Sequence, residues 1–245
     1  MASTSRAGKG SRSAQEKGTP RRVRRDPRRE ATRAALIEKA EAMFAESGIN
    51  GVSLRQIGAA VGSANANIIG YYFGEKEALI EAILLKHRLP VEEQRARLLD
   101  RACREGRGHE LSVLLDVLWR PLLDKKNSDG LHAYAAFLGS ITRSKFYALR
   151  LALNERFPVT QNIISRIAEL VPELPERYFR ARIHVLGDLI TGVLQRIDFD
   201  HEDDASAELL YADALRVAHA ILLAPVSAKL DRRANRKKPA SIVFV

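Results

Sequence analysis

Residues 52–79, which read VSLRQIGAAVGSANANIIGYYFGEKEAL, constrain the fold more than any other part of the chain. Ser53 is a residue type that caps the N-terminus of a helix. The apolar positions that follow it lie on one helical face: Leu54, Ile57, Gly58 and Val61. Gly62 interrupts this pattern, and a second short helix is expected over residues 64–72. Two short helices around a glycine turn indicate a helix-turn-helix.

Longer helices are expected on both sides of this motif. The first covers residues 28–47 and ends at Gly48, because glycine readily adopts the left-handed conformation that follows many helices. The second begins at residue 75, after Gly74, and continues to residue 102. Pro90 is expected to kink or break this helix, since proline cannot donate the backbone hydrogen bond of a helix interior.

Several features within residues 29–84 together resemble the TetR family of bacterial transcriptional regulators. They are an amphipathic helix that ends in Gly48, the capping Ser53, the helix around residues 57–61, an aromatic pair before Phe73 and the G-x-K-E-x-L run of residues 74–79. The chain departs from the commonest family pattern at Gly70, where many members carry tyrosine or asparagine. The resemblance implies a helical protein in which residues 28–74 form a DNA-binding domain.

The resemblance also implies which side chains of this domain contact DNA. They are Ser53, Arg55, Ser63, Asn65, Asn67, Tyr71, Tyr72 and Lys76. Asn65 and Asn67 suit base edges, because a carboxamide can form a paired contact with adenine, whereas Tyr71 and Lys76 suit phosphates. Each asparagine can alternatively be a turn or cap residue, and Tyr72 can alternatively pack inward.

The positive charge of the chain, +10 in total, is concentrated at its two ends. The first 30 residues hold eight arginines and two lysines against three acidic residues. Residues 1–27 have almost no large apolar side chain and are expected to form a disordered basic arm. Arg24 and Arg25, just before the first helix, are candidates for DNA contact. A solvated tail and an organelle transit peptide are the alternatives.

The overall composition predicts an all-α protein with a substantial core. Ala, Leu, Arg and Glu dominate, no segment resembles a hairpin, and 46% of the residues are hydrophobic. The single Cys103 excludes an internal disulfide and a zinc site built on cysteines. No apolar run reaches the roughly 18–20 residues that cross a bilayer, and none near the start resembles a signal peptide. A cytoplasmic protein without membrane contact is therefore expected.

Residues 75–224 are expected to form a second helical domain, followed by a basic tail over residues 225–245. Its last two long helices, predicted at residues 175–197 and 203–223, have apolar surfaces broader than one side of a monomeric bundle requires. Such surfaces suit a homodimeric four-helix interface, which the TetR resemblance also implies. The alternative is that the same surfaces are buried within a single chain.

The TetR resemblance further implies an apolar effector pocket between about residues 109 and 195. Its candidate lining residues are Trp119, Tyr134, Phe137, Phe146, His184 and Asp188. The alternative is that these aromatic side chains are ordinary core residues. His184 and Asp188 are four residues apart, but no third ligand is visible, so they do not predict a metal site. No metal and no cofactor are expected.

Enzyme motifs are missing from the chain: it lacks G-x-S-x-G, H-E-x-x-H, G-x-G-x-x-G and the phosphate-binding loop pattern. The sequence therefore predicts a regulator and not an enzyme. We expect a repressor that binds a palindromic operator as a homodimer and is released by a small apolar effector. The alternative is a helical-bundle enzyme or ligand-binding protein whose helix-turn-helix is only scaffold.

Overall fold

Ten helices and no strand make up the part of the chain that the computed structural model describes, namely residue 1 and residues 26–65 and 67–226. The helices are α1 (Pro27–Ser47), α2 (Leu54–Ala60), α3 (Ile68–Phe73), α4 (Lys76–Arg104), α5 (Leu111–Leu123), α6 (Ala133–Thr142), α7 (Tyr147–Asn154), α8 (Pro158–Glu169), α9 (Glu176–Asp200) and α10 (Asp204–Leu223). The prediction of an all-α protein is confirmed. Within these described residues, no helix has the length and apolar character needed to cross a membrane.

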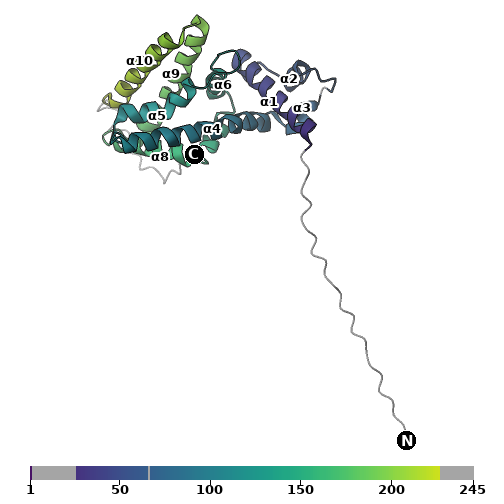
Figure 1. The fold of residues 1–245 in the computed structure, drawn as a ribbon, viewed down its shortest axis with the longest axis horizontal. Helices are drawn as coiled ribbons and strands as arrows, with labels where there is room; N and C mark the ends of the chain where they lie inside the picture. Colours follow the sequence, from purple (N-terminus) through teal and green to yellow (C-terminus); the bar gives the residue numbers. More distant parts are fainter. Residues whose placement is uncertain (2–25, 66, 227–245) are drawn as a thin grey trace.

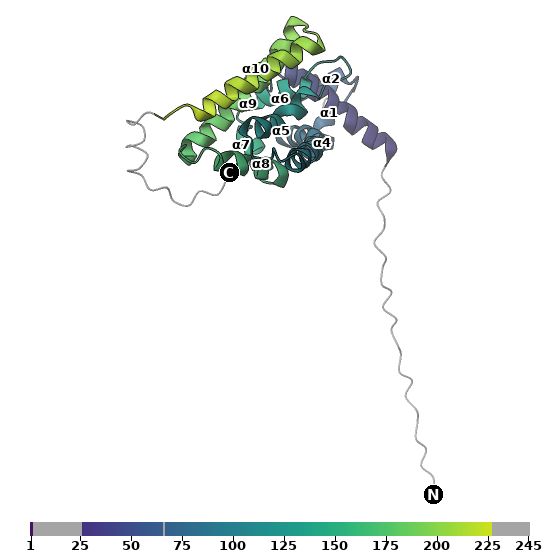
Figure 2. The ribbon, with the colours of Figure 1, turned by 60° about the vertical axis from the view of Figure 1, so that its left-hand side comes forward.

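The molecule has two parts that α4 connects. Helices α1 to α3 lie together at one end, and α4 extends from them into a bundle that contains α5 and α8 (Figure 1). Figure 2 shows α9 and α10 side by side along the outside of that bundle, and these two helices also contact each other extensively. Helix α4 therefore belongs to both parts.

The second helix of the helix-turn-helix is shorter than predicted. The sequence predicts a helix over residues 64–72, whereas α3 begins only at Ile68. The Asn65 N–H donates to Ser63 Oγ at 3.1 Å, and the Asn67 N–H donates to Asn65 Oδ1 at 2.9 Å. Such local bonds compete with the helical pattern and hold the chain in a turn.

Helix α4 runs through Pro90 without interruption, so the predicted break does not occur. Pro90 removes one hydrogen bond, to the carbonyl of Lys86, but Pro90 itself is exposed and water can reach this side of the helix. Pro158 occupies the first turn of α8, where a backbone N–H would have no partner within the helix. Pro175 is instead the residue that precedes α9.

The apolar core continues from the N-terminal helices into the bundle through α6. Phe137 of α6 stacks on Phe44 of α1, with ring centres 6.2 Å apart. The Ile49 N–H, in the loop after α1, donates to Ser140 Oγ of α6 at 2.8 Å. The N-terminal helices are therefore held by two elements of the bundle, α4 and α6.

The apolar surface of α9 and α10 is divided into an inner and an outer face. On the inner face, Phe179, Leu186 and Ile190 are buried within the chain, where α9 contacts α6 and α10. The outer face carries exposed apolar side chains: Val185, Phe199, Leu209, Leu210, Val217 and Leu223. One apolar face of these helices is thus buried within the chain, whereas another stays exposed.

Candidate functional site

The helix-turn-helix begins with a capping box at α2. The Gln56 N–H donates to Ser53 Oγ at 3.3 Å, and the Ser53 N–H donates to Gln56 Oε1 at 2.7 Å. These two bonds satisfy backbone groups that the start of a helix otherwise leaves unpaired. Arg55, in the first turn of α2, is exposed.

Two glycines set how α3 sits on α2. Gly62 has a φ of +72°, a left-handed conformation that favours glycine, and its N–H donates to the Ala59 carbonyl at 3.0 Å. Gly58 is buried, and a Cβ at this position would lie 3.0 Å from Ile68 Cγ2. Helix α3 therefore packs closely against α2 at a point where a side chain would interfere.

The two asparagines of the motif have different surroundings. Asn65 uses its side-chain oxygen to accept the Asn67 N–H and so shapes the turn, which is the alternative role that the sequence allows. Asn67 is exposed and makes no capping bond with its side chain. Its amide lies against Gly70, where a Cβ would come within 2.3 Å of Asn67 Oδ1. Of the two, Asn67 has the carboxamide that is better placed for a base edge.

Aromatic and basic side chains meet beside α3. Tyr71 is 64% exposed, and the Arg29 guanidinium of α1 lies 5.6 Å from the centre of its ring. Tyr72 is half-buried between Tyr71 and Phe73. Arg33, one turn after Arg29, lies 5.2 Å from the centre of the Phe73 ring. Reasoning from the motif alone misses these two arginines, although their spacing of four residues places them on one face of α1.

Lys76, which the resemblance suggests for phosphate contact, is turned inward. Its Nζ donates to the carbonyls of Ile49 and Val52, both at 2.5 Å, and lies 5.2 Å from the centre of the Phe44 ring. Burial, followed by the charge of Lys145, lowers the pKa of Lys76 below its ordinary value. The ammonium group of Lys76 thus closes the loop before α2 and is not presented to a phosphate.

The predicted DNA contacts therefore divide into groups. Those whose side chains are exposed and are not used in the cap or the turn are Arg55, Asn67 and Tyr71. Those whose side chains shape the cap and the turn are Ser53, Ser63 and Asn65. Arg24 and Arg25 lie outside the described residues. The exposed group, together with Arg29, is what the helix-turn-helix can present to a DNA groove.

Inside the bundle, a cavity of about 80 Å³ lies between α4, α5, α7, α8 and α9. The predicted ligand-binding residues that line it are Trp119, His184 and Asp188. The other three are buried without lining it: Tyr134, Phe137 and Phe146. Phe137 is used in the contact with α1, and Tyr134 stacks on His87 with ring centres 4.4 Å apart. The structure therefore favours ordinary core positions for these aromatic residues.

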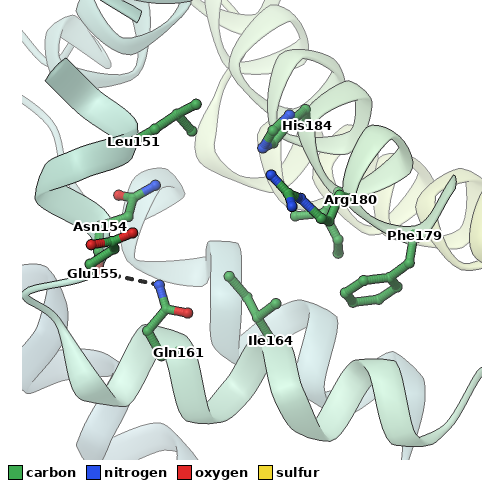
Figure 3. Close-up of a pocket in the computed structure, with 9 residues that line it drawn as sticks. Leu151, Asn154, Glu155, Gln161, Ile164, Phe179, Arg180 and His184 are labelled. Atoms are coloured by element: carbon green, nitrogen blue, oxygen red, sulfur yellow. Dashed lines mark hydrogen bonds between the residues drawn. The ribbon is translucent and has the colours of Figure 1, made fainter. Parts of the chain in front are cut away.

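A second cavity, of about 70 Å³, adjoins the first. Figure 3 shows its walls: Leu151 and Asn154 from α7 face His184 and Phe179 from α9, with Ile164 of α8 between them. Burial is the main cause that lowers the pKa of His184, and the charges of Arg150 and Arg180 lower it further. Since His184 lines both cavities and is itself exposed, they form neighbouring parts of one space that is partly open to solvent.

The lining of the first cavity is basic, contrary to the expected apolar pocket. Arg88 and Arg95 of α4 and Arg150 of α7 all reach it. Burial, followed by the charge of Arg88, lowers the pKa of Arg95 to about 10. The signal that could have marked these residues is their position, because Arg88 and Arg95 are seven apart, on the same face of α4 as the buried Val91. No group of metal-binding side chains able to hold an ion occurs among the described residues.

The fold of α1 to α4 and its exposed polar face define a helix-turn-helix DNA-binding protein. Residues 36–83 match the sequence model of the family described as bacterial regulatory proteins, tetR family. Residues 36–83 are thus a DNA-binding domain of the tetR type, as the resemblance seen in the sequence implies.

Other comparisons add little to this assignment. Among curated proteins, none matches the chain. One solved structure that is similar is that of a TetR-family transcriptional regulator from Pectobacterium atrosepticum, which is 20% identical in sequence. The alignment covers 83% of this chain and 100% of that chain, with a TM-score of 0.36. The family assignment therefore rests on residues 36–83.

Proposed function

We propose that the protein is a repressor that binds a palindromic operator as a homodimer and releases it when a small molecule occupies the interior cavity. The observation that carries this proposal is the position of α4. Leu79 and Ile83 of this helix are buried in the core with the helix-turn-helix, whereas Arg88 and Arg95 line the cavity. One rigid element thus joins the surface that would meet DNA to the space that would hold an effector.

In this proposal the chain has four parts. Residues 28–74 bind DNA, and residues 75–224 dimerise and bind the effector. Residues 1–27 and 225–245 are basic ends, whose charge would strengthen binding to any duplex. A protein of this kind acts on the bacterial chromosome, so we place it in the cytoplasm.

The outer face of α9 and α10 supports a homodimer. Val185 is 55% exposed and Phe199 is 73% exposed, fourteen residues apart on one side of α9. Leu210 and Val217, one seven-residue step apart, are exposed on α10. We expect Leu210→Glu to yield monomers in sedimentation and to weaken operator binding. Leu89→Glu, which changes an exposed leucine of α4 and not of α9 or α10, is the control.

The proposed release is a population shift between two positions of α4. The helix is tied to α1 next to the cavity, because Lys86 Nζ lies 3.1 Å and His87 Nε2 lies 2.7 Å from Glu41 Oε2. A maleimide cross-link between Glu41→Cys and His87→Cys, made in a Cys103→Ser background because Cys103 is exposed, would hold α4 against α1. Effector binding should then persist while release is lost. Release that survives the cross-link would refute α4 as the moving element.

The decisive experiment is selection of bound duplexes from a random pool at near-physiological salt, where non-specific attraction fades. The proposal predicts one palindromic motif with half-site centres about 34 Å apart. Asn67→Ala and Tyr71→Phe should weaken binding to that motif, while Lys76→Met should not change its salt dependence. Recovery of no motif would overturn the proposal and would favour a helical-bundle protein whose helix-turn-helix is scaffold.

A further inference from the structure

The larger of the two cavities in the bundle is lined by more positive than negative charge. Three guanidinium groups, those of Arg88, Arg95 and Arg150, line one small cavity. The carboxylate buried beside them is that of Glu92, and Asp188 lies at the exposed rim. Buried charges are costly unless they are paired and hydrogen-bonded. Each buried guanidinium therefore needs its own hydrogen-bond acceptors.

Two of the three have partners. Arg95 donates to the Leu118 carbonyl from Nε and Nη2, at 2.9 and 2.7 Å, and from Nη1 to Glu92 and Thr160. Arg150 Nη1 donates to the Leu138 carbonyl at 3.2 Å and to Thr142 Oγ1 at 2.9 Å, both on α6. These contacts fix Arg95 completely and fix one end of Arg150.

Arg88 is different. Its side chain is only 12% exposed, and neither Nε nor Nη2 has a hydrogen-bond partner within residues 26–65 and 67–226. Glu92 Oε1 is 3.8 Å from Nε, beyond hydrogen-bond reach, and the Phe157 ring lies 4.8 Å away. The hydroxyl of Tyr134 is also buried without a described partner, and it lies within electrostatic reach of Arg88 and Arg150. Buried donors without acceptors are rare in native proteins and require an explanation.

We propose that the effector of the proposed repressor is a small carboxylic acid, whose carboxylate is bound by Arg88 with Arg150 beside it. A carboxylate matches the planar fork of a guanidinium and would supply the acceptors that Nε and Nη2 lack. This inference rests on the proposed function and names the class of effector. It also explains why the cavity is basic.

The size and the walls of the two cavities limit the part of the effector that lies beyond its carboxylate. The two adjoining cavities measure about 80 and 70 Å³, well below the roughly 300–1,000 Å³ of pockets for drug-sized ligands. Leu151, Ile164 and Ile183 line both cavities and lead away from the arginines toward Phe179. A short aliphatic or single-ring acid fits this arrangement, with the charged group at Arg88 and the apolar part along α8 and α9.

The same arginines connect this site to the DNA-binding domain. Arg88 follows His87, which contacts Glu41 of α1. Arg150 holds the last turns of α6, and Ser140 of that helix accepts the Ile49 N–H. A carboxylate that draws Arg88 and Arg150 together would therefore act on both elements that hold α1.

Calorimetric titration of the full-length protein without DNA tests the proposal. The probes are butanoate, hexanoate and benzoate, each against its neutral primary amide, and inorganic phosphate. At least one acid should bind about 10- to 100-fold more tightly than its amide. Arg88→Met should abolish this difference and Arg88→Lys should reduce it, because lysine keeps the charge but loses the fork. Arg97→Met, which changes an exposed arginine of α4, should leave it intact.

The contrary outcomes are distinct. Amides that bind as tightly as the acids, or a folded Arg88→Met protein that keeps the difference, would overturn the proposal. Phosphate that binds as tightly as every acid would overturn the carboxylate class. Operator binding is measured separately: a specific operator without acid binding refutes only this inference. Acid binding without a specific operator refutes only the proposed repressor function.

Discussion

The N-terminal helices and the bundle satisfy their polar side chains in opposite ways. In the helix-turn-helix, Ser53 and Asn65 bond to groups two or three residues away, and Lys76 closes a loop onto two carbonyls. In the bundle, Arg95 reaches partners 23 and 65 residues away, and Arg88 has unpaired donors. In the helix-turn-helix, local hydrogen bonds hold these polar side chains in one conformation. In the bundle, the unsatisfied donors of Arg88 leave hydrogen bonds that a ligand can supply.

The difference between satisfied and unsatisfied polar side chains is tested most strongly by removing each interior arginine in turn. We expect Arg95→Met to lower the free energy of unfolding by about 3–5 kcal/mol, because it strips a buried carboxylate of its partner. Arg88→Met should change it by less than about 1 kcal/mol or should stabilise the protein, since a buried cation with two unsatisfied donors is removed while Glu92 keeps its bonds to Arg95 and Thr160. Urea unfolding of both variants, with Arg97→Met as control, measures the difference. Equal losses would mean that Arg88 is as well paired as Arg95.

The same contrast explains what the sequence could predict. Helix bounds, the cap at Ser53 and the turn at Gly62 depend on neighbours in the chain, so residue type and spacing indicate them. The start of α3 was misplaced because Asn65 can serve either a helix or a turn, and only its actual bond to Asn67 decides. The helices and the turn of the helix-turn-helix could therefore largely be predicted from the sequence. Which of its side chains are free on the exposed face could be predicted less well.

The interior site could not be predicted in this way. Arg150 reaches the cavity because α7 packs beside α4 and α6, and nothing within α7 itself indicates that packing. Aromatic residues were expected to mark the pocket, but Phe137 is used to join α6 to α1. A pocket is made by helices that are distant in sequence, and periodicity within one helix does not specify which helices meet.

A second prediction concerns the other end of α4. Lys76→Met should lower the free energy of unfolding by about 2 kcal/mol, because two carbonyls lose a charged donor. Lys39→Met, an exposed lysine of α1, should have an effect within about 0.5 kcal/mol. Under conditions where the variant is folded, its operator affinity should depend on salt as in the wild type. A salt slope reduced by about 1 would show that Lys76 contacts a phosphate after all.

A third prediction tests the close approach of α2 and α3. Gly58→Ala should cost about 1–2 kcal/mol, since its Cβ would lie 3.0 Å from Ile68 Cγ2. In an Ile68→Ala background the same change should cost much less, because the obstructing methyl group is gone. A double-mutant cycle measured by thermal unfolding gives this coupling directly. A cost that is unaffected by Ile68→Ala would place the obstruction elsewhere.

The smallest expected effect lies where the two regions meet, at the contact of His87 with Glu41. Burial lowers the pKa of His87 below 6.5, although the hydrogen bond to Glu41 acts in the opposite direction, and the charges of Lys125 and Lys86 lower it further. As the pH falls through 6.5, the unfolded chain therefore binds a proton before the folded one does, and stability is lost. For Glu41, burial raises the pKa, but the bonds and charges of His87 and Lys86 outweigh burial and lower it.

The contribution of Glu41 is therefore present above its unfolded pKa of 4.5 and is lost below it, as the pH falls through the folded value. Urea unfolding between pH 8 and pH 4 should show a first decline that begins near pH 6.5 and a second below about pH 4.5. His87→Gln should reduce the first decline and leave the part that comes from His184, whereas His109→Gln, an exposed histidine, should leave it unchanged. A stability that instead rises on acidification from pH 7 would mean that the ion pair with Glu41 prevails over burial. The junction between the DNA-binding helices and the bundle would then tighten in acid.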